Sequence, residues 1–465
     1  MSPAETLAPW VGADRALEAL DGAVARSRAD HLDVFLASRV GHHTRFAGDR
    51  IHQPQTIVEL QVMVRAVVGR GAARAAVSDL RHLPDAVDRA TELARGRDAV
   101  ANGGPAPAAP AGPQELEGGL SLWSDATAAW DGPARSRLAA RLMAAASAAG
   151  GECNGTLTTA ATELAVATSA GAREHAAASE AGFSLTQRVG PLSSYLADLS
   201  RHSERLGVEA RSEASLTRIS GAGEPVPLPD GSTDVVFGGL ASGELVGFVP
   251  SFGFTAPAVQ AGIGPLVTSP GVMLADGSVT VADDALTDVG LPFPFDLEGT
   301  AKQRVAMLDG GRAGAAVSDR ATAGATHGRS TGHAHIAREQ SPEPEAANLV
   351  MTAGADGEDA LIAAVERGVY VQRLWYNRLV DAKTGTVLGT TRDACFLIKD
   401  GVLSTPVAGG RFTESVLGAL ARTDGIGDRL ISQAVPNVWN GCVSAPAIRV
   451  RGFRFGARPA AEADE

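Results

Sequence analysis

The sequence predicts an α+β fold, in which N-terminal α/β segments are followed by a β-rich, mainly antiparallel C-terminal domain. Three observations support this prediction. Apolar residues alternate between helical and strand-like spacing over the first hundred positions. A Pro- and Gly-rich stretch, residues 101–113, then interrupts both patterns. From Asp234 onward, short apolar runs are separated by Asp-Gly turns at 276, 309 and 400, which is typical of antiparallel strands.

Residues 1–100 are expected to form an N-terminal α/β domain. Helical spacing predicts helices over Ala13–Arg28 and Leu83–Arg95. Short β-like runs predict strands at His31–Val40, Thr56–Val68 and Arg74–Ser78. Residues 101–113 (ANGGPAPAAPAGP) are predicted to be a linker, because their Pro and Gly content disfavours helix and sheet alike.

Residues 114–224 are expected to form a central domain. Pro133–Ala149 reads as a helix with Pro in its first turn and a Gly pair after its end. Leu164–Thr168 alternates like a strand, whereas Ala172–Ala181 fits a strand or an Ala-rich helix. A further helix is predicted over Tyr195–Leu206.

Residues 225–457 form the predicted β-rich C-terminal domain, and residues 458–465 an acidic tail. One helix is expected near Gly239–Phe252, where apolar residues continue without turn signals. His327–Asn348 is predicted to be a polar loop because it contains Gly and Pro.

Composition narrows the class of protein. The 465 residues include 41 basic and 53 acidic side chains, for a net charge of −12, which argues against a general role in nucleic-acid binding. No run of about 18 apolar residues predicts a transmembrane helix, so neither membrane nor nucleic acid is expected as a partner. Three widely spaced cysteines cannot form a disulfide framework and favour a reducing compartment, so we expect a cytoplasmic location.

Local motifs offer few catalytic groups. Gly328-Arg-Ser-Thr-Gly332 matches the G-x-S-x-G string of a nucleophile elbow, but neither the apolar strand before it nor the helix after it is predicted. His333 and His335 have the spacing that puts two imidazoles on one face of a strand. With Cys442 as a distant third ligand they could hold a metal; the alternative is a pair of solvated histidines. Asp283-Asp284 is interpreted as turn chemistry.

Several ordered segments of the second half resemble the TldD/PmbA (TldD/TldE) family of zinc metallopeptidases. The similarity begins at Pro225 and includes an FDxEG-like element at Pro294–Gly299 and an STGH stretch at Ser330–His333 that is similar to the PmbA branch. It continues through these segments: Gly368-Val-Tyr-Val371, Asp381-Ala-Lys-Thr-Gly385, Phe396–Val407, Gly441-Cys442 and Pro446–Val450. Residues Asp33–Arg95 resemble the first domain of the family more loosely.

The resemblance implies a specific division of labour. In the TldD branch, a helix carries H-E-x-x-x-H and a late Cys completes the zinc site; two His on one helical face and a thiolate suit tetrahedral zinc. The matching segment here, Gly239–Phe252 (GLASGELVGFVPSF), has no His, and its only acid is Glu244. Cys442 matches the late Cys but cannot hold zinc alone. The PmbA (TldE) branch also lacks this motif, and its members pair with a TldD chain to form the peptidase.

The resemblance therefore implies a TldE-like, non-catalytic subunit of a heterodimeric zinc metallopeptidase that acts on small or unfolded peptides. No cofactor is expected in this chain; zinc is expected in the HExxxH-containing partner. The residues that lie in family-like segments and could contact a peptide substrate are Glu298, His333, His335 and Arg338. Binding by strand addition would make such contacts tolerant of side-chain identity. Two alternatives remain, an autonomous metallohydrolase that uses His333, His335 and Cys442, and a non-enzymatic binding or scaffold protein of the same fold.

Overall fold

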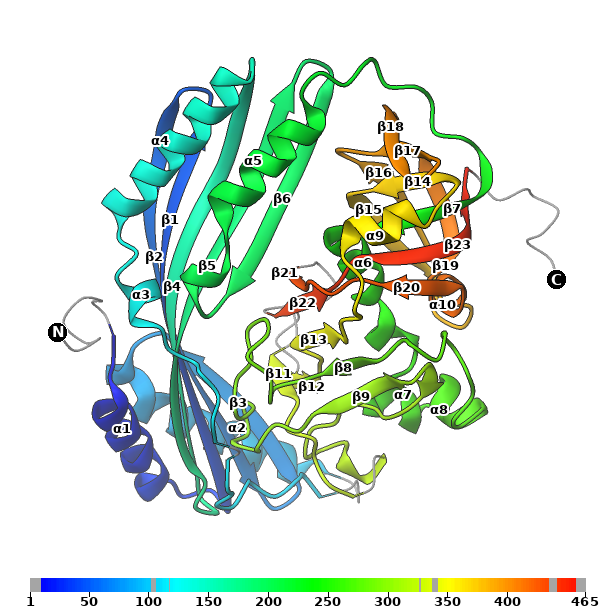
Figure 1. The fold of residues 1–465 in the computed structure, drawn as a ribbon. Helices are drawn as coiled ribbons and strands as arrows, with labels where there is room; N and C mark the ends of the chain where they lie inside the picture. Colours follow the sequence, from blue (N-terminus) through cyan, green and yellow to red (C-terminus); the bar gives the residue numbers. More distant parts are fainter. Residues whose placement is uncertain are drawn as a thin grey trace.

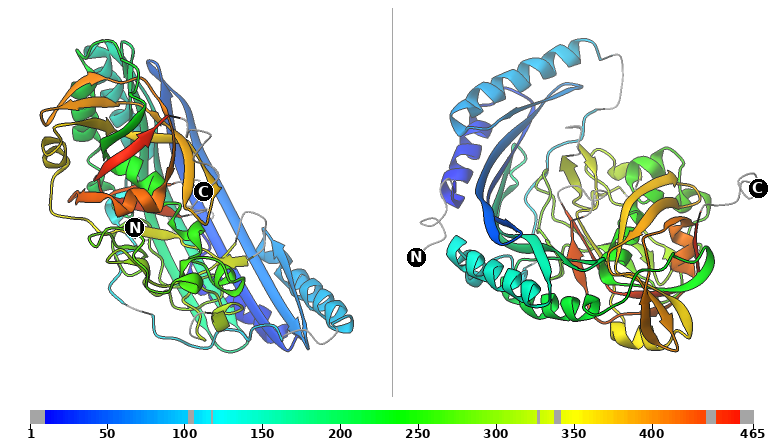
Figure 2. Two further views of the ribbon diagram at one scale, coloured as in Figure 1. Left: turned by 90° about the vertical axis from the view of Figure 1, so that its right-hand side faces the viewer. Right: turned by 90° about the horizontal axis from the view of Figure 1, so that it is seen from above.

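A computed structural model describes residues 10–101, 106–116, 118–325, 328–336, 342–434 and 441–456. Two lobes are present (Figure 1). The N-terminal lobe, up to Ile219, is one curved sheet with helices on its outer side, and the C-terminal lobe, from Gly231, lies against the inner side of that sheet (Figure 2). In the described part of the chain, no helix is long and apolar enough to cross a membrane.

One antiparallel six-stranded sheet, in the order β3-β2-β1-β4-β5-β6, forms the N-terminal lobe. Its strands are β1 (His31–Ala47), β2 (Arg50–Val68), β3 (Gly71–Val77), β4 (Gly151–Thr168), β5 (Arg173–Val189) and β6 (Leu192–Ser200). Its helices are α1 (Ala13–Arg26), α2 (Leu83–Ala99), α3 (Asp125–Ala128), α4 (Gly132–Ala148) and α5 (Val208–Ile219).

This sheet corrects the predicted domain boundaries. β1 pairs with β4 over fourteen residues, from Asp33↔Thr168 to Phe46↔Gly155, so the segments 1–100 and 114–224 share one sheet instead of forming two domains. Residues 106–113 are not a free linker: Arg65 donates to the carbonyl of Ala108 at 2.7 Å. The predicted linker is therefore hydrogen-bonded to the sheet.

Strand alternation separates the two faces of the sheet. Val34 and Leu36 pack with the helices on the outer face, whereas Phe35 packs with Val166 and with Phe295 of the C-terminal lobe. Because side chains in a strand point to opposite faces in turn, β1 alone contributes to two cores. Contacts between the inner face of this sheet and Phe295 thus help to position the C-terminal lobe.

The helix predicted over Tyr195–Leu206 was wrong. Residues 192–200 form β6, which pairs with β5 from Val189↔Leu192 to Ala181↔Ser200. The apolar spacing of this segment fits either structure, and cross-strand pairing with β5 decides between them. The ambiguous segment Ala172–Ala181 also forms a strand, within β5.

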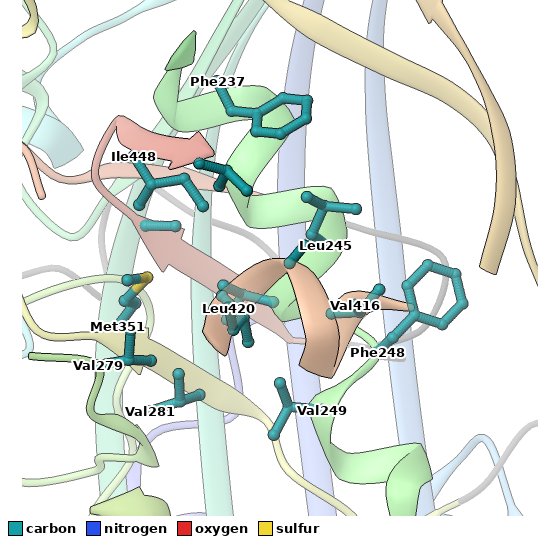
Figure 3. Packing of buried hydrophobic residues seen from close by; sticks show 14 of the residues in the cluster. Phe237, Leu245, Phe248, Val249, Val279, Val281, Met351, Val416, Leu420 and Ile448 are labelled. Carbon is teal, nitrogen blue, oxygen red and sulfur yellow. The ribbon is translucent and has the colours of Figure 1, made fainter. Parts of the chain in front are cut away.

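Two six-stranded sheets and a three-stranded sheet build most of the C-terminal lobe, with the orders β10-β9-β8-β13-β22-β21, β18-β17-β14-β7-β23-β20 and β15-β16-β19. The pairing is mainly antiparallel, as predicted, with two parallel pairs, β13–β22 and β14–β7. Figure 3 shows the core between the sheets, which includes Phe237, Leu245, Val281 and Ile448.

The strands of this lobe are β7 (Gly231–Phe237), β8 (Val281–Asp283), β9 (Val305–Asp309), β10 (Arg312–Ala313), β11 (Ala334–Ile336), β12 (Pro342–Pro344), β13 (Asn348–Met351), β14 (Arg367–Val371), β15 (Arg373–Asp381), β16 (Thr386–Arg392), β17 (Phe396–Lys399), β18 (Val402–Pro406), β19 (Arg411–Ser415), β20 (Thr423–Ile426), β21 (Ile431–Gln433), β22 (Cys442–Ala445) and β23 (Ile448–Phe455). Its helices are α6 (Gly239–Val246), α7 (Ala256–Gln260), α8 (Pro265–Thr268), α9 (Glu358–Ala363) and α10 (Val416–Ala421). The predicted helix at Gly239–Phe252 is confirmed as α6 and a following 3-10 turn, Val249–Phe252. The predicted acidic tail lies outside the described residues.

Candidate functional site

A buried ionic cluster forms where β8 meets the segment that leads into β11. Asp283 ends β8, and its Oδ1 lies 3.0 Å from Nε2 of His333 and 3.8 Å from Nζ of Lys302. Its Oδ2 accepts the backbone N–H groups of Ala347, at 2.5 Å, and Asn348, at 3.0 Å. Asp283 and His333 are almost completely shielded from solvent. The cluster therefore joins a buried Asp283–Lys302 ion pair to the imidazole of His333 by close contact, while backbone hydrogen bonds reach only Oδ2 of Asp283.

Electrostatics fix the protonation states of this cluster. Burial disfavours the ionised form of Asp283, but the charge of Lys302 and the contact with His333 outweigh it and hold the pKa of the carboxyl well below its usual range. Burial and the nearby Lys302 lower the pKa of His333, so its imidazole is neutral near pH 7. Its other nitrogen, Nδ1, lies 2.9 Å from Oγ1 of Thr331. Asp283 and Lys302 thus form a buried ion pair, and the neutral imidazole of His333 lies against the carboxylate.

Two expectations are corrected by this geometry. Asp283 is not part of a solvated turn, because it is a buried strand residue whose partner comes from a distant segment. His333 is not a solvated loop histidine, and with no exposed side-chain surface it cannot contact a peptide substrate in this conformation. Asp283 and Lys302 were missed because nothing in their local sequence marks them. The one available signal is that Lys302 is among only three lysines in the chain.

The second histidine of the predicted pair faces different neighbours. His335 Nδ1 lies 3.5 Å from Oε2 of Glu345, and its side chain is partly exposed. In the described residues, no group of three or more His, Cys, Asp and Glu side chains is arranged to hold a metal ion. The structure therefore does not assemble the alternative centre of His333, His335 and Cys442. Arg338 lies outside the described residues.

Glu298 lies close to the cluster, at the junction with the N-terminal lobe. Its Oε2 accepts the backbone N–H of Arg320 at 3.0 Å, and Arg320 in turn donates to the carbonyls of Ala109 and Pro110. Desolvation and the neighbouring carboxylate of Asp296 raise the pKa of Glu298. Asp296, also buried, accepts backbone N–H groups at both oxygens. Glu298 is thus held by backbone groups at the boundary between the lobes.

Cys442 is a packed thiol. It is fully buried on β22, and its S–H donates to Oδ1 of Asn348 at 3.1 Å. Burial raises the pKa of the thiol to about 12, which keeps it protonated at neutral pH. A protonated, hydrogen-bonded thiol packs like a small apolar side chain.

Helix α6 occupies the position at which the resemblance places the zinc helix, and it is tightly packed. The Gln433 amide donates to the carbonyl of Leu240 at 2.6 Å, and a Cβ added to Gly243 would lie 2.6 Å from that amide nitrogen. The hydroxyl of Ser242 donates to the carbonyl of Pro446. Glu244 accepts from Nδ2 of Asn377 at 2.9 Å, and burial raises the pKa of its carboxyl. These residues do not fit a zinc site, because no imidazole is present and the side of α6 at Gly243 is filled by an amide.

The remaining motifs also take structural roles. Ser330, the central residue of the G-x-S-x-G string, donates to the carbonyl of Ser318 at 3.3 Å, and strand β11 follows instead of a helix. The nucleophile-elbow geometry is therefore not formed.

Comparisons with known proteins agree with this fold. Residues 230–457 match the family model described as the PmbA/TldA metallopeptidase C-terminal domain. The crystal structure of TldE from Thermococcus kodakarensis aligns with 96% of this chain and 100% of its own, at 17% identity and a TM-score of 0.82. The crystal structure of a Thermotoga maritima protein described as a modulator of a DNA gyrase aligns with 94% of this chain and 99% of its own, at 15% identity and a TM-score of 0.79. The crystal structure of a Bacteroides thetaiotaomicron protein with the same description aligns with 97% of this chain and 100% of its own, at 18% identity and a TM-score of 0.71. No protein with a curated description matches the sequence.

Proposed function

Because residues 230–457 place this chain in the PmbA/TldD metallopeptidase family, we propose that it is the non-catalytic, TldE-like subunit of a heterodimeric zinc metallopeptidase. The full-length likeness to the TldE fold supports the choice of branch. In this proposal the chain closes the active-site chamber of an HExxxH-containing partner and helps to bind peptide substrates.

The observation that carries the proposal is the composition and packing of α6. The helix has no imidazole, and the side chain of Gln433 fills the space beside Gly243. Glu244, the only acid of the helix, is hydrogen-bonded to Asn377 rather than facing a free position. A family-like fold whose described residues present no group of metal ligands agrees with a structural subunit of a metalloenzyme.

Peptide binding in the chamber remains part of the proposal. Glu298 and His335 are partly exposed and lie in the C-terminal lobe, so both can approach a substrate backbone. Arg338 is proposed for the same role. Addition of the peptide as an extended strand would supply affinity through backbone groups and would tolerate varied side chains.

The test is co-purification with the homologous chain that carries H-E-x-x-x-H in the same genome. We expect light scattering to report a one-to-one complex at micromolar concentration, and zinc analysis to find the metal only when the partner is present. Two separate peaks would overturn the proposal. Zinc bound by the chain alone would favour the autonomous metallohydrolase, and copurification from its own cells with no HExxxH-containing partner would favour the scaffold alternative.

A further inference from the structure

The hairpin of β15 and β16 carries a cluster of exposed aromatic and cationic side chains, here called the aromatic–arginine surface. It consists of Trp375, Tyr376, Arg378, Leu388 and Arg392. Trp375 is 38% exposed and Tyr376 is 66% exposed, which is high for such large rings. Trp375 pairs with Thr390, and Arg378 with Leu388, across the hairpin. Because β15 is an edge strand of its sheet, Trp375, Tyr376 and Arg378 lie at a sheet edge, and Leu388 and Arg392 lie beside them on the neighbouring strand β16.

Guanidinium groups hold the rings in place. The Cζ of Arg373 lies 4.4 Å from the centre of the Trp375 ring, and the Cζ of Arg392 lies 5.1 Å from it. Arg373 also stacks on Tyr195 of the N-terminal lobe, at 3.6 Å, and Arg378 lies 5.7 Å from the Tyr376 ring. Cation–π contacts of this kind restrict the side chains before any partner binds, which lowers the entropic cost of docking.

The backbone presents Tyr376 at a conformational cost. Its φ of +59° lies in the left-handed region, which a bulky side chain rarely adopts. The β15–β16 register shifts between Trp375 and Arg378, so a bulge occurs at this point. Bulges redirect side chains, and unfavourable backbone conformations cluster at functional sites. The strain at Tyr376 is therefore a second observation that sets this surface apart.

The charge of the surface indicates what it binds. Arg378 and Arg392 are exposed, and neither forms an ion pair with an acidic side chain of the described residues. Arg373 is paired, at 3.3 Å, with the buried carboxylate of Asp393. The surface is thus locally cationic on a chain whose net charge is −12. Trp, Tyr and Arg are the residues that contribute most to binding energy at protein interfaces.

We propose that the aromatic–arginine surface docks an extended, acidic polypeptide segment that also carries apolar side chains. The class of occupant rests on the proposed function, in which peptides are the substrates. Leu388, which is exposed and lies opposite Arg378 in the hairpin, offers a contact for an aliphatic side chain. A single-stranded nucleic acid could also stack on the rings, but the acidic chain repels a polyanion more strongly than a segment with a few carboxylates.

The experiment measures fluorescence anisotropy with the isolated chain, so that it is independent of the metallopeptidase partner. The probe is a fluorescein-labelled synthetic peptide that mixes Glu with Leu and Val; a peptide with Gln in place of Glu and an oligothymidylate serve as comparisons. We expect the acidic peptide to bind best, and Trp375→Ala, Arg378→Glu and Arg392→Glu each to weaken it at least about tenfold. Arg89→Glu and Leu93→Ala, exposed positions on α2, are the matched controls and should leave binding unchanged.

Tyr376→Gly separates docking from folding. Glycine adopts a positive φ without strain, so this variant should keep or raise the melting temperature while it weakens peptide binding. Equal affinity of the acidic peptide for all these variants would overturn the proposal. Tighter binding of oligothymidylate, lost in the same variants, would overturn it in favour of a nucleic-acid surface. If the peptide does not bind but the heterodimer forms, the proposed function stands and only the docking surface is rejected. If the peptide binds but no heterodimer forms, only the subunit role is rejected.

Discussion

Oδ1 of Asp283 and Nε2 of His333 lie 3.0 Å apart in the interior, although the two residues come from different segments of the C-terminal lobe. Lys302 supplies the compensating positive charge at 3.8 Å. A buried charge is stable only when it is paired and hydrogen-bonded, so the three residues form one structural unit.

Asp283→Ala should therefore destabilise the chain strongly. It leaves the Lys302 ammonium without its carboxylate, and removing one partner of a buried ion pair costs roughly 3–5 kcal/mol. Urea unfolding measures the change. Asp284→Ala is the control, because Asp284 pairs with the half-exposed Arg304 and such pairs contribute about 0–1 kcal/mol. Equal effects of the two substitutions would contradict the structural role of the cluster.

Glu298→Gln should change how stability depends on pH. Burial and Asp296 raise the pKa of Glu298, so the folded chain holds a proton that the unfolded chain has already released. The folded state then binds more protons, and the free energy of unfolding falls as pH rises from the usual carboxyl pKa through the raised one. Glutamine does not titrate, so the free energy of unfolding of the variant should fall less with rising pH. The variant should therefore be more stable relative to wild type above the raised pKa than below it. Denaturation at a series of pH values tests this; parallel curves for the two proteins would contradict it.

The cysteines should be unreactive in the folded chain. Cys153, Cys395 and Cys442 are all buried, and burial raises the pKa of each thiol to about 12. A thiol reagent such as DTNB should modify none of them near pH 8 until denaturant is added. Rapid modification of one thiol in the native state would show that its burial is incomplete.

Cys442→Ala tests whether this thiol is a packing residue or a zinc ligand in the heterodimer. If Cys442 only packs against Asn348, its loss should cost about 1 kcal/mol and leave the zinc content and maximal rate of the heterodimer unchanged. Metal analysis and peptidase assays of the complex measure both. Loss of zinc from the complex would instead show that Cys442 is a ligand.

Gly239→Ala should destabilise the chain, which is the reverse of the usual effect inside a helix. A Cβ at this position would lie 2.9 Å from the carbonyl oxygen of Ala445 and 2.8 Å from Cγ1 of Ile431, and such overpacking costs about 1–3 kcal/mol. Gly22→Ala on α1 is the matched control: no neighbouring atom lies within 4 Å of its added Cβ, so it should stabilise by roughly 0.5–1 kcal/mol. Thermal melts of both variants give the signs, and a stabilised Gly239→Ala would mean that the space beside α6 is open.

The amino-acid order alone predicts the class of fold and most of the local elements. Helical and strand periods are local properties, and they predict α1, α2, α4, α6 and the first three strands without reference to tertiary contacts. The missing imidazoles of the zinc helix are also a fact of sequence, because a ligand that is not encoded cannot be supplied by folding. Cys442 has no encoded histidine partners on that helix, and it packs as a small apolar group on β22.

Which distant segments share a sheet or a site depends on long-range packing. The β1–β4 pairing merged two predicted domains, and pairing with β5 turned the expected helix at Tyr195 into β6. The partnership of Asp283 with His333, and the exposure of Trp375 and Tyr376, likewise depend on the arrangement of neighbouring strands. Local spacing cannot encode these outcomes, because burial and ion pairing are set by which remote side chains fill the surrounding space.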